Sequence, residues 1–153
     1  MSFYSLRSTR IAGFTLVEIL VVLGVIGVLT SIAVPVYKWN KERQKVNTAI
    51  VDISVIALTL KGIEMDNREY PETMPEDLQK LDPWGNPYQY LQMQGASNGE
   101  KRKDKSLVPI NTDFDLYSMG PDGRSVGPLT AKQSRDDIVR AANGRFIGIA
   151  ADF

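Results

Sequence analysis

Residues 14–34 form an apolar run of 21 residues, FTLVEILVVLGVIGVLTSIAV, in which Glu18 is the only charged side chain. At about 1.5 Å per residue, a helix of this length spans the hydrocarbon core of a bilayer, which is about 30 Å thick. The run exceeds the apolar core of a signal peptide, which has about 7–15 residues. We therefore predict a membrane-spanning helix; the alternative is a buried core helix, which a domain this small rarely contains.

Histidine and cysteine are both absent from the 153 residues. Their absence excludes Ser-His-Asp and Cys-His nucleophilic sites and metal sites built on imidazole or thiolate ligands. The remaining oxygen ligands suit a hard cation such as calcium. Basic and acidic residues balance at 18 each, so no bulk charge indicates a nucleic-acid partner. We expect neither an enzyme nor a nucleic-acid-binding protein.

After residue 34, the apolar residues take the three- and four-residue spacing of an amphipathic helix. The stripe consists of Val46, Ala49, Ile50, Ile53, Ile56, Ala57, Leu60 and Ile63. We predict one long helix over residues 14–66, bent or loosened at Pro35, whose ring removes a backbone hydrogen bond. The second half of this helix has a face to bury, whereas the first half can contact only lipid or copies of itself.

The rest of the chain has short segments separated by turn-forming residues. Alternating patterns predict strands over residues 88–93, 114–119 and 145–150. Residues 75–81 predict a short helix with proline in its first turn. The spacing Ser134-Arg135-Asp136-Asp137 is that of a capping box and predicts a helix over residues 138–142. We expect an α+β fold, with the long helix packed on a small antiparallel sheet and a loop-rich C-terminal region.

Residues 13–18 read Gly-Phe-Thr-Leu-Val-Glu and follow a basic segment. This motif closely resembles the processing site of precursors in the type IV pilin-like family. The resemblance implies that a prepilin peptidase cuts after Gly13 and methylates the new amino terminus at Phe14. It also implies that the peptidase reads Glu18, the fifth residue of the mature chain. The expected parts are a leader (1–13), a transmembrane and assembly helix (14–34) and a periplasmic pilin-like domain (35–153), which includes the rest of the helix.

Two further segments, DPWGNPYQY at 82–90 and DLYSMGPDG at 115–123, resemble the major pseudopilins of type II secretion systems. The resemblance implies a structural subunit that polymerises into a periplasmic fibre and drives protein export. After Gly123 the chain departs from the family pattern, with Arg-Ser-Val-Gly-Pro-Leu in place of a Gly-rich loop. The alternatives are a minor pseudopilin, a subunit of a surface pilus, which often carries a disulfide that this chain lacks, and a membrane-tethered binding module or enzyme.

The same resemblance implies a location and partners. We expect a single-pass protein of the inner membrane of a Gram-negative bacterium, with its globular domain in the periplasm. The expected partners are further copies of the chain in a helical fibre, the prepilin peptidase, other pseudopilins and inner-membrane secretion components. The basic residues that follow the apolar run outnumber Arg7 and Arg10 before it, so the positive-inside rule alone predicts the opposite orientation.

Glu18 lies within the apolar run, where a charged side chain costs at least about 2.5–3.5 kcal/mol on insertion scales. Cutting after Gly13 creates an α-amine four residues away. Pairing of Glu18 with the amine of a neighbouring copy would fix the axial register of the fibre, as one buried polar residue does in a coiled coil. The alternative is a glutamate close enough to the membrane surface to reach the head groups.

Asp122, Asp136 and Asp137, together with the carbonyls of residues 120–129, are candidate ligands for one calcium ion. The family resemblance suggests this site, because relatives of the major pseudopilin bind calcium in this loop. The alternative is that hydrogen bonds and packing close the loop. In that case Asp122-Gly123 forms a turn, and Asp136 and Asp137 begin a helix.

Overall fold

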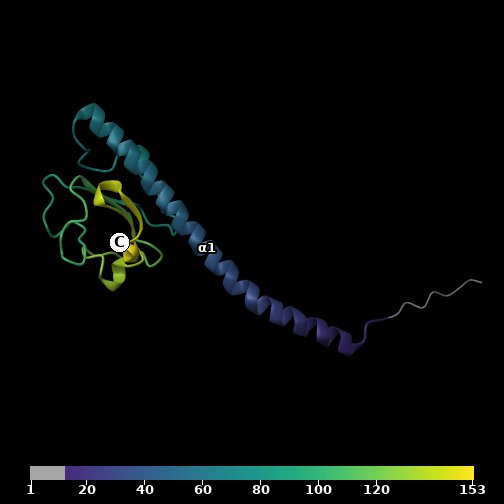
Figure 1. The fold of residues 1–153 in the computed structure, drawn as a ribbon. Helices are drawn as coiled ribbons and strands as arrows, with labels where there is room; N and C mark the ends of the chain where they lie inside the picture. The colour runs from purple at the N-terminus through teal and green to yellow at the C-terminus, as the bar shows by residue number, and fades with distance from the viewer. Residues whose placement is uncertain (1–12) are drawn as a thin grey trace, which may run out of the picture. The chain divides into compact units, whose positions relative to one another are not determined.

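A computed structural model describes residues 13–153, and most of the helical residues belong to one element. Helix α1 (Leu16–Asn67) has 52 residues and continues through Pro35; Figure 1 shows it as one coiled ribbon. The prediction of one long helix over residues 14–66 is confirmed. Residues 1–12, which hold most of the predicted leader, lie outside the described residues.

The chain divides after Asn40 into two compact units. In the first unit, α1 is long and apolar enough to cross a membrane, and none of its apolar window is buried within the protein. Leu20 and Ile32, for example, are 59% and 63% exposed. A continuous apolar surface of this size is stable against lipid or other protein chains rather than in water. These observations favour a membrane-spanning helix over a buried core helix.

In the second unit, α1 buries one face against the sheet. The buried residues of this face are Ala49, Ile53, Ile56, Ala57 and Leu60. They form one core cluster with Tyr88, Phe114, Leu116 and Ile138. This is the face that the apolar stripe predicts. Full burial of a side chain such as Ile53 stabilises the fold by about 1.5–3 kcal/mol.

The sheet has four antiparallel strands in the order β1-β2-β3-β4. The strands are β1 (Gln89–Gln92), β2 (Phe114–Ser118), β3 (Ile138–Ala141) and β4 (Phe146–Ile149). Side chains alternate between the two faces of a strand. Thus Phe114 and Leu116 join the cluster on α1, whereas Tyr117 packs with Val139 and Leu129 in a second cluster. The predicted α+β fold and the three predicted strands are confirmed.

The helix predicted over residues 138–142 is wrong, because strand β3 occupies these residues. Ser134 does not cap a helix: its Oγ accepts a bond from Val126 N at 2.9 Å and donates to Val126 O at 2.8 Å. Asp137 accepts bonds from Ser125 and Arg102. Both ends of the expected capping box therefore bond to distant residues, and the β-branched pair Ile138 and Val139 continues as a strand.

Four short 3-10 helices complete the described fold: η1 (Glu76–Leu78), η2 (Lys132–Ser134), η3 (Ala142–Gly144) and η4 (Ala150–Asp152). The helix predicted over residues 75–81 is thus shorter than expected. The connection from β2 to β3, residues 119–137, contains η2 and is called the β2–β3 loop below.

Candidate functional site

The segment that precedes α1 is open to its surroundings. Gly13 has non-helical backbone, and a Cβ added to it would meet no heavy atom within 4 Å. Phe14 is 80% exposed. Nothing in the described fold therefore requires glycine at position 13 or an aromatic residue at position 14. A requirement for these residues must come from a molecule that contacts the segment.

Glu18 has a local role that the sequence analysis missed. Thr15 Oγ1 accepts a hydrogen bond from Glu18 N at 3.2 Å, and Thr15 N donates to Glu18 Oε2 at 3.5 Å. This reciprocal pair is a capping box, which satisfies two backbone donors at the start of α1. The spacing Thr-Leu-Val-Glu could have indicated it. Glu18 is exposed and lies in the first turn of α1, where a negative charge is favourable.

A second apolar stripe lies along α1 in the globular unit, on residues that do not face the core. Its members are Val51, Val55, Leu58 and Met65, which are 59%, 56%, 70% and 79% exposed. Their spacing of four, three and seven residues places them along one side of the helix. An apolar stripe of this kind on a soluble unit is typical of a surface that contacts another chain.

The three carboxylates proposed for calcium have different surroundings. Asp122 is exposed, and its Oδ1 accepts a bond from Arg124 N at 2.8 Å. Asp136 is half-buried beside Gly120. Asp137 is fully buried and forms an ion pair with Arg102. Within residues 13–153, no group of three or more acidic side chains is arranged to hold a metal ion.

Burial raises the pKa of Asp137 to about 6, although hydrogen bonds from Ser125 and the charge of Arg102 lower it. The carboxylate is therefore ionised and paired above pH 6. Sequence analysis missed both Arg102 and Ser125 as partners. They lie 35 and 12 residues from Asp137, and no local spacing links them to it.

A second buried arginine lies in the core beside β2. Arg140 Nη2 is 2.6 Å from Asp113 Oδ2, and its guanidinium carbon lies 4.0 Å from the centre of the Phe114 ring. Burial opposes ionisation of Asp113, but the hydrogen bond from Arg140 and backbone hydrogen bonds outweigh it and lower the pKa of this carboxyl group. This pair has a structural role, because it ties the start of β2 to β3.

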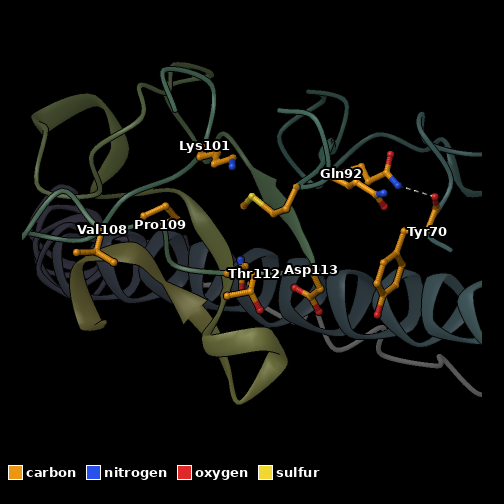
Figure 2. A pocket seen from close by; sticks show the side chains of 10 residues that line it. Tyr70, Gln92, Lys101, Val108, Pro109, Thr112 and Asp113 are labelled. Atoms are coloured by element: carbon orange, nitrogen blue, oxygen red, sulfur yellow. Dashed lines mark hydrogen bonds between the residues drawn. The ribbon is translucent and has the colours of Figure 1, made fainter. Parts of the chain in front are cut away.

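A surface cavity of about 610 Å³ is lined by residues between Tyr70 and Asp113. Figure 2 shows Lys101 and Asp113 at this cavity, with Gln92 donating to the Tyr70 carbonyl at 2.9 Å. The carboxylate of Asp113 is already paired with Arg140. Since its lining offers no paired nucleophile and base, we assign no catalytic role to the cavity.

Comparison with known proteins gives a family match at the start of the chain. The model described as "Prokaryotic N-terminal methylation motif" matches residues 8–34. This range includes Gly13, Phe14 and Glu18 and ends with the apolar run. No solved structure matches the chain significantly.

Curated relatives extend the similarity over most of the chain, and each of three is named type II secretion system core protein G. The relative from Pseudomonas aeruginosa is 34% identical over 139 residues, which cover 76% of this chain and 87% of the relative. The relative from Aeromonas hydrophila is 32% identical and covers 78% and 90%. The relative from Vibrio cholerae is 32% identical and covers 77% and 86%.

Proposed function

The chain belongs to the family of type II secretion system core protein G, and on that premise we propose that it is a structural subunit of a pseudopilus. In this role, copies of the chain polymerise into a periplasmic fibre that drives protein export by type II secretion. The observation that carries the proposal is the 34% identity over 139 residues to a relative with that name. We propose no catalytic activity for it.

The surface of α1 supports assembly through like subunits. Its first half has no buried apolar residues within the protein, and its second half adds the exposed stripe of Val51, Val55, Leu58 and Met65. Packing these surfaces against α1 of neighbouring copies would bury apolar area that a single copy leaves exposed. The same helix can lie in the inner membrane before assembly, with the globular unit in the periplasm.

The open geometry at Gly13 supports recognition by a prepilin peptidase. A peptidase must bind its substrate in an accessible, non-helical conformation, and Gly13 and Phe14 are exposed ahead of the first turn of α1. In the proposed reaction the peptidase cuts after Gly13 and methylates the amine of Phe14. The other proposed partners are further pseudopilins and inner-membrane components of the secretion system.

The test is the intact mass of the protein purified from membranes of a host that has the peptidase. We expect the 140 residues from Phe14 to Phe153, heavier by one methyl group. Gly13→Leu should leave the chain uncut. Gly62→Leu is the matched control, because Gly62 also has nothing within 4 Å of an added Cβ, and it should be cut normally. Uncut wild-type chains in assembled fibres would contradict the proposal.

A further inference from the structure

Arg102 is an arginine inside the fold. Its side chain is 3% exposed, and its guanidinium carbon lies 4.3 Å from the centre of the Tyr117 ring on β2. Its backbone N donates to Asp115 Oδ2 at 2.7 Å. A charged group is buried at this depth only where partners replace the lost water. The partners of Arg102 therefore show what its charge is used for.

Within residues 13–153, the hydrogen-bond acceptors of the guanidinium all belong to the β2–β3 loop. Nη1 donates to Ser125 Oγ and to the Val126 carbonyl, and Nη2 donates to Asp137 Oδ2. A hydroxyl, a carbonyl and a carboxylate are the oxygen types that proteins use to hold a hard cation. One positive charge thus joins the first half of the loop to the residue that precedes β3.

The backbone next to Arg102 is tied to the same loop. Lys103 N donates to Gly127 O at 2.9 Å, and Leu129 N donates to Lys103 O at 2.8 Å. These bonds fix the position of the Arg102 backbone relative to the loop. The backbone and the guanidinium therefore hold the same loop through separate hydrogen bonds.

Calcium does not fit this arrangement. Of the three carboxylates expected to bind it, Asp122 is exposed, Asp136 is half-buried beside Gly120, and Asp137 is buried and accepts the hydrogen bond from Arg102. Asp137 Oδ1 has no hydrogen-bond partner among the described residues, but a calcium ion bound there would lie beside the guanidinium on Oδ2. Repulsion between like charges is strong at such a distance in a buried site.

We propose that the Arg102 guanidinium is the built-in cation of the β2–β3 loop and that the loop closes in this protein without calcium. The arginine supplies the positive charge that Asp137, Ser125 and the Val126 carbonyl require. This proposal is independent of fibre formation, because it concerns the fold of a single chain.

The test uses the full-length chain in detergent micelles at pH 8, where Asp137 is ionised. Thermal unfolding is followed by near-ultraviolet circular dichroism in millimolar calcium and in chelator. The wild type should melt at the same temperature in both. Arg102→Met should melt about 10 °C lower or more, because it leaves Asp137 buried without a cation. Lys105→Met is the matched control, since Lys105 is exposed, and it should melt like the wild type.

A local measurement separates loop opening from general destabilisation. Limited trypsin digestion below the melting temperature, read by mass spectrometry, reports cleavage after Arg124 and Lys132 in the loop. Cleavage there should be faster in Arg102→Met than in the control. Arg102→Lys should be intermediate in both measurements, because a lysine keeps the charge but lacks the fork that reaches three oxygens.

Two results would overturn the proposal. One is a wild-type melting temperature that calcium raises by several degrees over chelator. The other is an Arg102→Met variant with wild-type melting and cleavage. If Arg102→Met does not fold, the wild type and Arg102→Lys decide the question: a calcium-indifferent wild type with a weakened lysine variant supports the proposal, and an unweakened lysine variant overturns it.

Discussion

Gly120, which follows β2 by two residues, lies against the backbone of Asp136 at the far end of the same loop. Its φ is +64°, and an added Cβ would lie 2.4 Å from Asp136 O and 2.9 Å from the carbonyl carbon. Its N–H donates to Ser118 Oγ at 3.0 Å, and its carbonyl accepts from Asn86 Nδ2 at 3.1 Å. To relieve the clash, Gly120→Ala must move either the Asp136 backbone or the Gly120 backbone. The Gly120 backbone is held by hydrogen bonds at both its N–H and its carbonyl.

The expected loss has two parts. A left-handed backbone costs an alanine about 1–2 kcal/mol, and overpacking against a backbone that cannot yield costs about 1–3 kcal/mol. Their sum, about 2–5 kcal/mol, lowers the melting temperature by about 8–20 °C for a unit of this size. Gly85 isolates the first part: its φ is +98°, and an added Cβ meets nothing within 4 Å. Gly85→Ala should therefore carry only the conformational cost, about 4–8 °C.

The assay is thermal unfolding of both full-length variants and the wild type in detergent micelles, followed by circular dichroism. Gly120→Ala should melt at least several degrees below Gly85→Ala. A φ of +98° lies further from the left-handed region of L-residues than +64°, so alanine has at least as large a conformational cost at position 85 as at position 120. A lower melting temperature for Gly120→Ala must therefore come from the steric clash. Equal melting temperatures would show that the Asp136 backbone moves aside at no cost, and the steric reasoning would then be wrong.

Two further predictions concern charged groups. If the charge of Glu18 sets the register of the fibre, Glu18→Ala and Glu18→Gln should both be inserted and largely cut. Both should nevertheless yield at least tenfold fewer fibres by electron microscopy than the wild type at an equal amount of cut protein. Recovery in Glu18→Gln, which retains a capping side chain, would assign the effect to the capping box alone. Because the folded-state pKa of Asp113 is lowered, its contribution to stability is present above pH 4 and lost as pH falls through the folded pKa. The melting temperatures of wild type and Asp113→Asn should therefore converge on acidification; a constant difference from pH 7 to pH 3 would exclude this linkage.

Much of the fold follows from patterns that are local in sequence. The apolar run and the stripe through Ile53 and Leu60 predict α1 and its buried face, because helical periodicity reports directly on which side is buried. The alternation in residues 88–93 and 114–119 likewise predicts β1 and β2. In each case, the information lies within one element.

The errors arise where side chains bond across long separations. Ser134 and Asp137 have the spacing of a capping box, but their partners are Val126, Ser125 and Arg102. Tertiary bonds therefore override the local preference, and the following residues become β3. No spacing in the sequence indicates that an arginine 35 residues earlier pairs with Asp137, so the surroundings of the candidate calcium site could not be predicted.

Because the cation that Ser125, Val126 and Asp137 bind is the Arg102 side chain, the fraction of folded chains should not depend on a supply of metal ion. A diffusible ion stabilises a fold by an amount that grows with the logarithm of the free ion concentration. The folded fraction therefore falls when a chelator removes the ion. A cation attached to the chain is present once per molecule at a fixed effective concentration. The folded fraction of a chain closed in this way does not depend on the calcium concentration of the surrounding compartment.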